Sequence, residues 1–275
     1  TLAQPKPKNP CMPKISLQSL TPMLLPLTLM QIAQPALADN LRIAVASNFT
    51  PTLKQITQRF EQQTEHQISL ISGSTGKHYA QIRNGAPFDA FFAADSQRPK
   101  RLELEGNALT SSRFTYAIGK LVLWSPKADF FSGSSEILQQ DHFHYLAIAN
   151  PKLAPYGRAA QQVMQAKGVW QSLQGKLVRG ENIAQAYQYV QTGNAQLGFV
   201  ALSQLQLLNQ RNHINQKSID SEIPGSYWLP DQSLYSPIEQ QAVLLNDKAA
   251  AQQFFRFVQS PEIKQLIQDQ GYAPP

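Results

Sequence analysis

The chain has 275 residues, of which 42% are apolar, and this is enough for one large domain or two lobes with separate cores. Such an apolar content is typical of globular proteins and excludes a disordered chain. The formal net charge is +6, and it falls to +3 without the first 38 residues, which contain three lysines and no acidic residue. A charge of +3 neither favours nor excludes nucleic acid as a partner.

The first 38 residues differ from the rest of the chain. The apolar stretch Leu20–Ala38 is interrupted by three prolines and ends in the small-x-small pattern Ala36-Leu37-Ala38. This pattern predicts that Met12–Ala38 is a secretory signal peptide, cleaved after Ala38. The alternative, an amphipathic first helix, is disfavoured by the prolines. Because of this leader, we expect the mature protein to be periplasmic. Cys11 is lost with the leader, so the mature protein would contain no thiol. No later apolar run is long enough to span a bilayer.

The mature chain begins with a strand, a turn and a helix. Leu41–Ala46 predicts a buried strand, and the helix after it shows an apolar face at i, i+3 and i+7. Between the two lies the turn Ser47-Asn48-Phe49-Thr50-Pro51. Pro51 suits a first helical turn, and Ser47, Asn48 or Thr50 is expected to cap the helix.

The same arrangement follows at once. Ile68–Ile71 predicts a second buried strand, and Tyr79 and Ile82 predict a helix that ends at Gly85. The turn between them, from Ser72 to Gly76, contains only small residues, three of them hydroxylated. Free N–H groups and the positive end of the dipole make the start of such a helix suitable for an anion, and small hydroxylated residues leave room for it.

Strands and helices continue to alternate, and the second half repeats the plan of strand, turn and helix N-terminus twice. The long apolar run Phe114–Trp124 predicts one strand, or two joined at Gly119, that leaves one lobe and enters another. The other expected elements are strands at Ala90–Ala93, Tyr145–Ala149, Leu177–Val178, Leu197–Leu202 and Ala242–Asn246, helices at Pro99–Glu105, after Gly157, after Asn182 as its cap, around Phe254 to Val258 and from Pro261, and a polar surface connection at Asn209–Ser221.

This alternation predicts an α/β protein. Two halves that each present helix N-termini at turns favour a clamshell, with its ligand between the lobes at the carboxyl ends of the strands. Neutral hydroxyl and N–H donors suit an oxyanion that carries no proton, since such an anion needs donors only.

A set of short motifs runs in order from about Asn40 to the C-terminus. These are Val45-Ala-Ser-Asn48, Gly73-Ser-Thr-Gly-Lys77, Gly85-Ala-Pro-x-Asp89 with Ala94-Asp95, Asn150-Pro with Pro155-Tyr-Gly157, Gly180-Glu-Asn-Ile183 and Tyr235-x-Pro-Ile238. Together they resemble the periplasmic molybdate-binding proteins of ABC importers. The resemblance implies the two-lobed type II periplasmic binding protein fold, with the ligand cleft between the lobes.

The resemblance also implies the positions of the oxyanion contacts. They fall on Ser47 (hydroxyl and N–H), Asn48, Thr75 with Ser74 beside it, and, mainly through backbone N–H groups, Tyr156 and Ile183. Two departures bear on the choice of anion. Thr75 stands where some members have serine, and its methyl group is expected to tighten the cavity. Ala201 stands where other members have a tyrosine hydroxyl, which Asn48 is expected to replace.

Other readings of these residues remain. Gly73–Lys77 resembles half of a phosphate-binding loop but lacks its spacing and a Ser or Thr after Lys77, so we expect no nucleotide and a solvated lysine. His142 and His144 lack a third ligand at a convincing spacing, and we expect them at a surface strand end. Asp89 and Asp95 flank a strand without a nucleophile and are interpreted as turn caps. Glu181 is expected to turn outward at its helix start.

The resulting hypothesis is a monomeric binding protein that captures molybdate, and also tungstate, and delivers it to a membrane permease. It needs no cofactor, no catalytic residue and no direct protein ligand to the molybdenum, and it has no nucleic acid partner. We expect lobe 1 to span 39–118 and 225–275, and lobe 2 to span 119–224. The alternatives are a binding protein for sulfate or another tetrahedral oxyanion, an anion-sensing partner, and an exported enzyme on the same fold.

Overall fold

The computed structural model describes residues 1–10, 38–215 and 223–275, and for 210–215 only the backbone. Residues 1–10 are exposed and carry no regular secondary structure. The predicted signal peptide, except Ala38, and Cys11 lie outside the described residues. The chain from Leu37 to Pro275 forms one compact unit.

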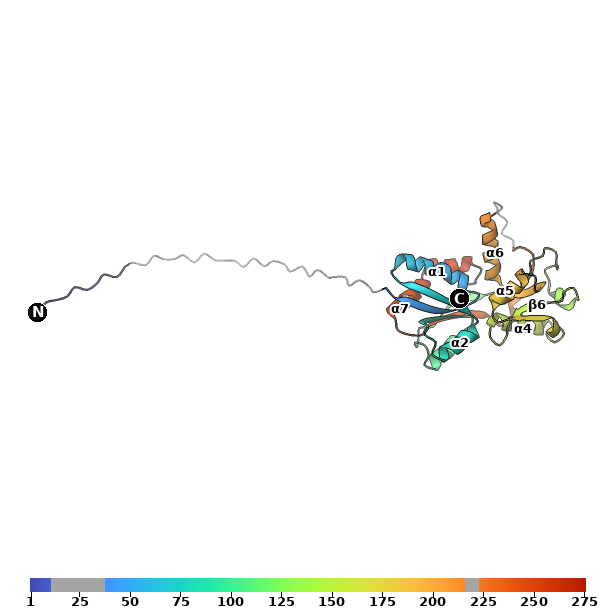
Figure 1. The fold of residues 1–275 in the computed structure, drawn as a ribbon, viewed down its shortest axis with the longest axis horizontal. Coiled ribbons are helices and arrows are strands. Elements are labelled where there is room, and N and C mark those ends of the chain that lie inside the picture. The colour runs from blue at the N-terminus through green and yellow to red at the C-terminus, as the bar shows by residue number, and fades with distance from the viewer. Residues whose placement is uncertain (11–37, 216–222) are drawn as a thin grey trace. The chain divides into compact units, whose positions relative to one another are not determined.

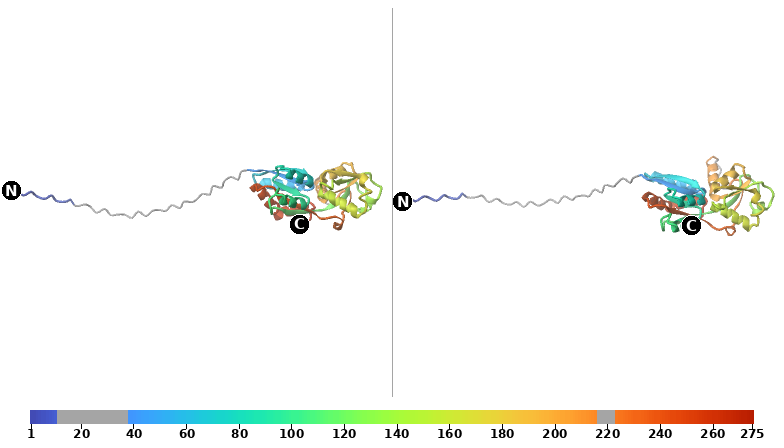
Figure 2. Two further views of the ribbon diagram at one scale, coloured as in Figure 1. Left: turned by 90° about the horizontal axis from the view of Figure 1, so that it is seen from below. Right: turned by 60° about the horizontal axis from the view of Figure 1, so that its bottom comes forward.

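Two five-stranded sheets define the two lobes of this unit. The first lobe is built on the sheet β2-β1-β3-β10-β4, and the second on β7-β6-β8-β5-β9. The strands are β1 (Asn40–Ala46), β2 (Gln67–Gly73), β3 (Ala90–Ala93), β4 (Phe114–Gly119), β5 (Leu121–Ser125), β6 (Leu146–Ala149), β7 (Leu177–Gly180), β8 (Leu197–Ala201), β9 (Ser226–Trp228) and β10 (Ile238–Leu244). Figures 1 and 2 show the two lobes side by side from three directions.

Helices cover both sheets, as the predicted α/β class requires. Figure 1 shows α1, α2 and α7 around the first sheet, and α4, α5 and α6 around the second. The helices are α1 (Thr50–Gln63), α2 (Thr75–Arg83), α3 (Gln97–Leu104), α4 (Pro155–Ala166), α5 (Ile183–Gln191), α6 (Leu202–Asn215), α7 (Ala249–Val258) and α8 (Pro261–Asp269), with short 3-10 turns at Ser135–Gln139, Gln174–Lys176 and Gln232–Leu234.

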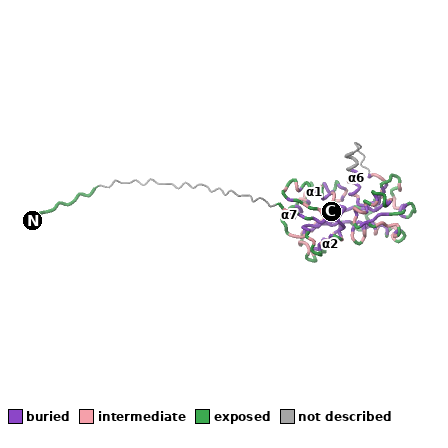
Figure 3. Tube along the Cα trace, viewed as in Figure 1, coloured by how far each residue is buried: buried purple, intermediate pink, exposed green. Residues whose placement is uncertain are grey.

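The central strands are buried because their residues face helices on both sides, whereas the predicted buried strand at Ile68–Ile71 is wrong in its burial, since β2 is an edge strand with half-buried and exposed residues. Along β1, Leu41, Ile43 and Val45 pack into one apolar cluster, while Ala44 packs into another on the opposite face of the sheet. This alternation follows the two-residue period of a strand. Figure 3 shows the buried strands of both lobes in purple. Each lobe therefore has its own core. The cluster of the second lobe also includes three residues of the first lobe, Ala46, Ala94 and Ile238.

Two segments connect the lobes. The predicted long strand is divided between the sheets: β4 pairs with β10 in the first, and β5 pairs with β8 and β9 in the second. The chain returns between Trp228 and Ile238. The predicted lobe 1 includes residues 225–275. This is wrong for β9 (Ser226–Trp228), because β9 pairs with β5 in the second sheet. The rest of the predicted division into lobes stays a prediction.

The predicted surface connection Asn209–Ser221 is wrong at its start. Helix α6 runs from Leu202 to Asn215, and Leu205 is fully buried within the second core. The turn from β8 into α6 is closed by Gln204, whose Oε1 accepts the Ala201 N–H at 3.0 Å. A helix therefore continues where the polar composition of the segment favoured a loop.

Candidate functional site

A small cavity lies where strand ends and helix N-termini of both lobes meet. It leaves ≈ 10 Å³ for the centre of a water-sized sphere. Each residue that lines the cavity is electrically neutral, and the lining includes all six predicted contact residues. The full lining consists of Ala46, Ser47, Asn48, Gly73, Ser74, Thr75, Ala94, Ala154, Pro155, Tyr156, Asn182 and Ile183. The structure thus brings together residues more than 130 positions apart in the sequence.

Three helices begin at this cavity without a side-chain cap. The residues before α1, α2 and α4 are Phe49, Ser74 and Ala154, and none of them accepts a first-turn N–H with its side chain. The predicted capping of α1 by Ser47, Asn48 or Thr50 is therefore wrong. The first N–H groups of a helix have no partner within it. These helices leave donors available for an anion, together with the positive ends of their dipoles.

Ser47 and Asn48 form the turn between β1 and α1. The Ser47 hydroxyl oxygen accepts the N–H of Ala184, on α5 of the second lobe, at 3.3 Å. The Ser47 N–H donates to the Gly73 carbonyl at 2.9 Å, so only the hydroxyl of the two implied groups remains for an anion. The Asn48 side-chain amide donates to Gln240 and Tyr272 and does not replace the hydroxyl missing at Ala201. Among the described residues the Asn48 N–H has no acceptor.

Ser74 and Thr75 begin α2. The Thr75 hydroxyl oxygen accepts the Ala94 N–H at 3.0 Å, which leaves its own proton free to donate into the cavity. The Ser74 hydroxyl is buried, and no partner for it lies among the described residues. A buried hydroxyl without a partner is costly, and the cost is removed when an acceptor binds beside it.

Tyr156 and Ile183 supply the second lobe's side of the cavity. Tyr156 follows Pro155 at the start of α4, and Ile183 is the first residue of α5. Both N–H groups lack an acceptor within the described part of the chain. Asn182 caps α5 as predicted, because its side chain accepts the Gln185 N–H at 3.1 Å. That bond does not involve the Ile183 N–H, which therefore stays available to a ligand in the cavity that Ile183 lines.

Direct contacts hold the two lobes together around the cavity. The Gly76 N–H donates to the Leu153 carbonyl of the second lobe at 2.8 Å. Beside it, the Lys77 ammonium lies 2.8 Å from a Glu181 carboxylate oxygen, with both side chains about half exposed. Lys77 and Glu181 therefore pair with each other, where the sequence indicated a solvated lysine and an outward carboxylate. Their opposite charges offset each other close to the cavity-lining residues Thr75 and Asn182.

The other charged candidates have structural roles. Asp95 caps α3 by accepting the Arg98 N–H at 3.0 Å, as predicted. Asp89 accepts from the Arg42 N–H at 2.7 Å and from Asn246 and Lys248. Burial alone would raise the pKa of Asp89, but these bonds outweigh it and lower the pKa. A carboxylate held in this way is not available as a general base.

The two surface histidines are exposed, as predicted, and no group of three metal-ligating side chains occurs in the described ranges 1–10, 38–215 and 223–275. His142 instead lies 2.9 Å from the Gln140 side-chain oxygen. Nothing in this part of the chain therefore favours a metal-ion site.

His78 lies buried in the first turn of α2, with Nδ1 3.0 Å from the Gln81 side-chain oxygen. Burial lowers the pKa of His78 below 6.5, although the bond to Gln81 acts in the opposite direction. The unfolded chain therefore binds this proton more tightly than the folded one, and stability falls as the pH drops through 6.5 and below.

We expect the melting temperature of the anion-free protein to fall between pH 7.5 and 5, and His78→Gln to remove part of this fall. Differential scanning calorimetry at both pH values measures it. An unchanged pH dependence in the variant would assign the effect to other groups.

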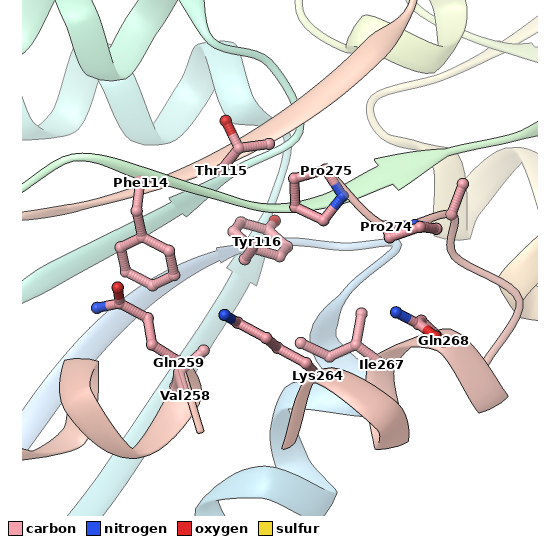
Figure 4. A pocket seen from close by; sticks show the side chains of 11 residues that line it. Phe114, Thr115, Tyr116, Val258, Gln259, Lys264, Ile267, Gln268, Pro274 and Pro275 are labelled. Atoms are coloured by element: carbon pink, nitrogen blue, oxygen red, sulfur yellow. The ribbon is translucent and has the colours of Figure 1, made fainter. Parts of the chain in front are cut away.

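A larger hollow lies elsewhere on the first lobe. It leaves ≈ 320 Å³ by the same measure, between β4, α7, α8 and the C-terminal residues. Figure 4 shows Phe114, Tyr116 and Ile267 around it, with the Lys264 side chain among them. Its lining is mainly apolar and also carries the Thr115 hydroxyl, the Gln259 and Gln268 amides and the Lys264 ammonium. None of the six predicted contact residues lines it, and all six line the smaller cavity.

Sequence reasoning missed the polar side chains behind the cavity. Gln240 and Tyr272 both bond to Asn48, from 192 and 224 positions away in the chain. Gln240 lies two residues before the predicted returning strand Ala242–Asn246, whereas the observed β10 begins at Ile238. Its full burial depends on contacts with distant residues, and no local sequence signal indicates it.

Three comparisons with known proteins agree with this geometry. Residues 41–273 match the family of bacterial extracellular solute-binding proteins. The molybdate-binding protein ModA of Azotobacter vinelandii is 44% identical over 246 residues, covering 88% of this chain and 93% of that protein. The chain belongs to the bacterial extracellular solute-binding protein family. The resemblance seen in the motifs is thereby confirmed.

Further members of the solute-binding family support the assignment. The ModA protein of Rhodobacter capsulatus is 43% identical over 247 residues, covering 89% of this chain and 92% of that protein. The solved structure of the Azotobacter vinelandii periplasmic molybdate-binding protein superposes with a TM-score of 0.78 at 40% identity, covering 86% of this chain and 99% of that one. The two-lobed type II fold is confirmed. No helix in the described ranges combines the length and the apolar character needed to cross a bilayer.

Proposed function

We propose that this protein captures molybdate in the periplasm and delivers it to the membrane permease of an ABC importer. One observation carries the proposal: hydroxyl groups, and N–H groups of both lobes that have no acceptor among the described residues, line a cavity of neutral residues only. A molybdate dianion needs donors only, and charge-assisted bonds to oriented N–H groups can replace its water. The relatives named as molybdate-binding proteins support the choice of anion.

The lining also bears on the competing anions. Phosphate carries a proton at neutral pH and needs an acceptor, and the cavity lining contains no carboxylate. Tungstate has the same charge and shape as molybdate, so we propose that it binds as well. Sulfate differs mainly in its shorter bonds, so we propose that donors spaced for the longer molybdenum–oxygen bonds form weaker hydrogen bonds with it.

The same lining favours binding over catalysis. Three hydroxyls line the cavity, and among the described residues none of them is hydrogen-bonded to a histidine or a carboxylate that could act as a general base, a pair that nucleophilic catalysis needs. We therefore propose a monomer that is not an enzyme, needs no cofactor, makes no direct bond to molybdenum and does not bind nucleic acid. We propose that the leader directs it to the periplasm and is cleaved after Ala38.

Isothermal titration of the mature protein, from Asp39 onward, with molybdate, tungstate, sulfate and phosphate tests the proposal. Saturable binding of molybdate and tungstate, at least about a hundredfold tighter than sulfate, is the expected result. Binding of sulfate alone would favour a sulfate-binding protein. The absence of heat and of any shift in melting temperature with all four anions would refute the proposal.

The ion pair between Lys77 and Glu181 gives a reciprocal prediction. Lys77→Glu places two carboxylates together close to the cavity. Because these negative charges repel a dianion, we expect the variant to bind molybdate about five- to tenfold more weakly. The double variant Lys77→Glu with Glu181→Lys restores a pair of opposite charges. Its Kd for molybdate is expected to return to within about twofold of the original, because the orientation of an exposed ion pair contributes little free energy. Titration calorimetry of the two variants measures both values. Failure of the second change to restore binding would show that the pair does not act as a unit.

A further inference from the structure

Gln240 occupies an unusual position in β10. It pairs with Ala117 of β4, next to the segment that crosses between the lobes, and the pairing register shifts between Gln240 and Gln241. Such a bulge redirects neighbouring side chains. Gln241 bonds to Arg113 at 2.8 Å and to Thr115 at 2.9 Å, within the first lobe.

Gln240 bonds instead toward the anion cavity, and to both lobes. Its Oε1 accepts from the Asn48 amide at 2.8 Å and from the Tyr116 hydroxyl at 3.2 Å. Its Nε2 donates to the Tyr156 hydroxyl at 3.3 Å. The side chain is fully buried. Asn48 and Tyr156 lie on opposite sides of the cavity, so one amide connects the two walls.

Further contacts fix each wall to this amide. The Tyr272 hydroxyl donates to the Asn48 carbonyl at 2.9 Å, which orients the peptide groups of that turn. On the other side, a Cβ at Gly119 would lie 2.2 Å from the Tyr156 hydroxyl oxygen, so the crossing segment has no side chain where the hydroxyl lies against it. Glycine at this position lets Tyr156 reach Gln240.

The network has little freedom to rearrange without loss. All its polar groups are buried, and a buried group that loses its partner is strongly destabilising. Burial also raises the pKa of Tyr116 and Tyr156 well above 10 and that of Tyr272 to about 12, so the phenols stay neutral at physiological pH. One uncharged bond of this network, from Gln240 to Tyr156, therefore links the two lobes behind the cavity.

We infer that Gln240 is a positioning residue that sets the spacing between the Asn48 and Tyr156 walls, and thereby the size of oxyanion that the cavity accepts. This inference rests on the proposed function. Gln240 does not touch the anion in this account. It acts through the two residues whose N–H groups face the cavity.

The test compares Gln240→Met with Gln241→Met. Methionine has nearly the length of glutamine but no amide, and both glutamines are buried neighbours on one strand. We expect Gln240→Met to weaken molybdate binding about tenfold or more and to lower the ratio of molybdate to sulfate affinity by a similar factor, as measured by titration calorimetry. Gln241→Met is expected to keep both values within about twofold, even where its melting temperature falls as much.

Each outcome decides the matter. Equal changes in the two variants, or an unchanged anion ratio in Gln240→Met, would overturn the inference and leave a purely structural glutamine. If Gln240→Met does not fold, Tyr156→Phe removes only the link to the second lobe, and the same loss of discrimination is expected. An unchanged ratio in Tyr156→Phe would then overturn it. Failure of the unsubstituted protein to bind either anion would refute the proposed function instead.

Discussion

Replacing Ser74 with aspartate is expected to abolish molybdate binding while the protein stays folded. Ser74 is the N-cap residue of α2, its hydroxyl is buried in the cavity lining, and it has no partner among the described residues. Aspartate is a favoured N-cap, because its carboxylate accepts the first N–H groups and complements the helix dipole. The new carboxylate would therefore occupy the donors that an oxyanion needs, and it would also repel a dianion.

We expect the affinity for molybdate to fall at least about a thousandfold, since a like charge inside a binding site costs several kcal/mol. The melting temperature without anion is expected to change by only about 2–4 °C, or by less than about 1 kcal/mol. Ser74→Asn is the matched control, because asparagine has the same shape and capping ability without the charge. Similar losses in both variants would show that bulk, and not charge, excludes the anion.

Gly157→Ala is expected to destabilise the protein by about 3 kcal/mol, the upper end of the range for overpacked sites. A Cβ on Gly157 would lie 2.2 Å from the Ala149 carbonyl oxygen and 2.7 Å from its carbon. These are backbone atoms at the end of β6, and they cannot move aside without shifting the strand. The first turn of α4 would move instead and carry with it the adjacent Tyr156 N–H, so that molybdate affinity falls as well.

The expected loss of stability in Gly157→Ala is opposite in sign to the usual effect of replacing glycine with alanine in a helix. Alanine in place of glycine inside a helix normally stabilises by about 1 kcal/mol. Gly175→Ala in the same lobe is the control, because a Cβ there meets nothing within 4 Å. It is expected to change stability by less than about 0.5 kcal/mol. Urea unfolding of the two variants measures both, and equal stabilities would contradict the close packing of α4 on β6.

Local chemistry made much of the fold and site predictable. Hydroxylated turns after apolar strands indicated the starts of α1 and α2, and Asn182 indicated the cap of α5. These predictions succeed because strand burial, turn composition and helix starts depend on residues close together in the sequence. The length of Phe114–Trp124 indicated a segment that passes from one lobe to the other, and of the two expected forms the structure shows two strands divided at Gly119.

The errors arose where distant residues decide the structure. The Asn48 side chain is committed to Gln240 and Tyr272, and the Ser47 N–H to Gly73, and no local pattern reveals such partners. Helix α6 and strand β9 were missed for a related reason. A three-residue strand is stable only through its pairing with β5, and that pairing joins segments about 100 positions apart.

The most direct measurement is a crystal structure of the mature protein with molybdate, with the metal located by its anomalous scattering at the molybdenum absorption edge. We predict one molybdenum peak between the lobes, with only oxygen bonded to the metal. The anion is expected to be surrounded by the hydroxyls of Ser47, Ser74 and Thr75 and the N–H groups of Asn48, Tyr156 and Ile183. A peak in the hollow beside Lys264, or no ordered peak between the lobes, would contradict an anion site made of neutral donors from four helix starts.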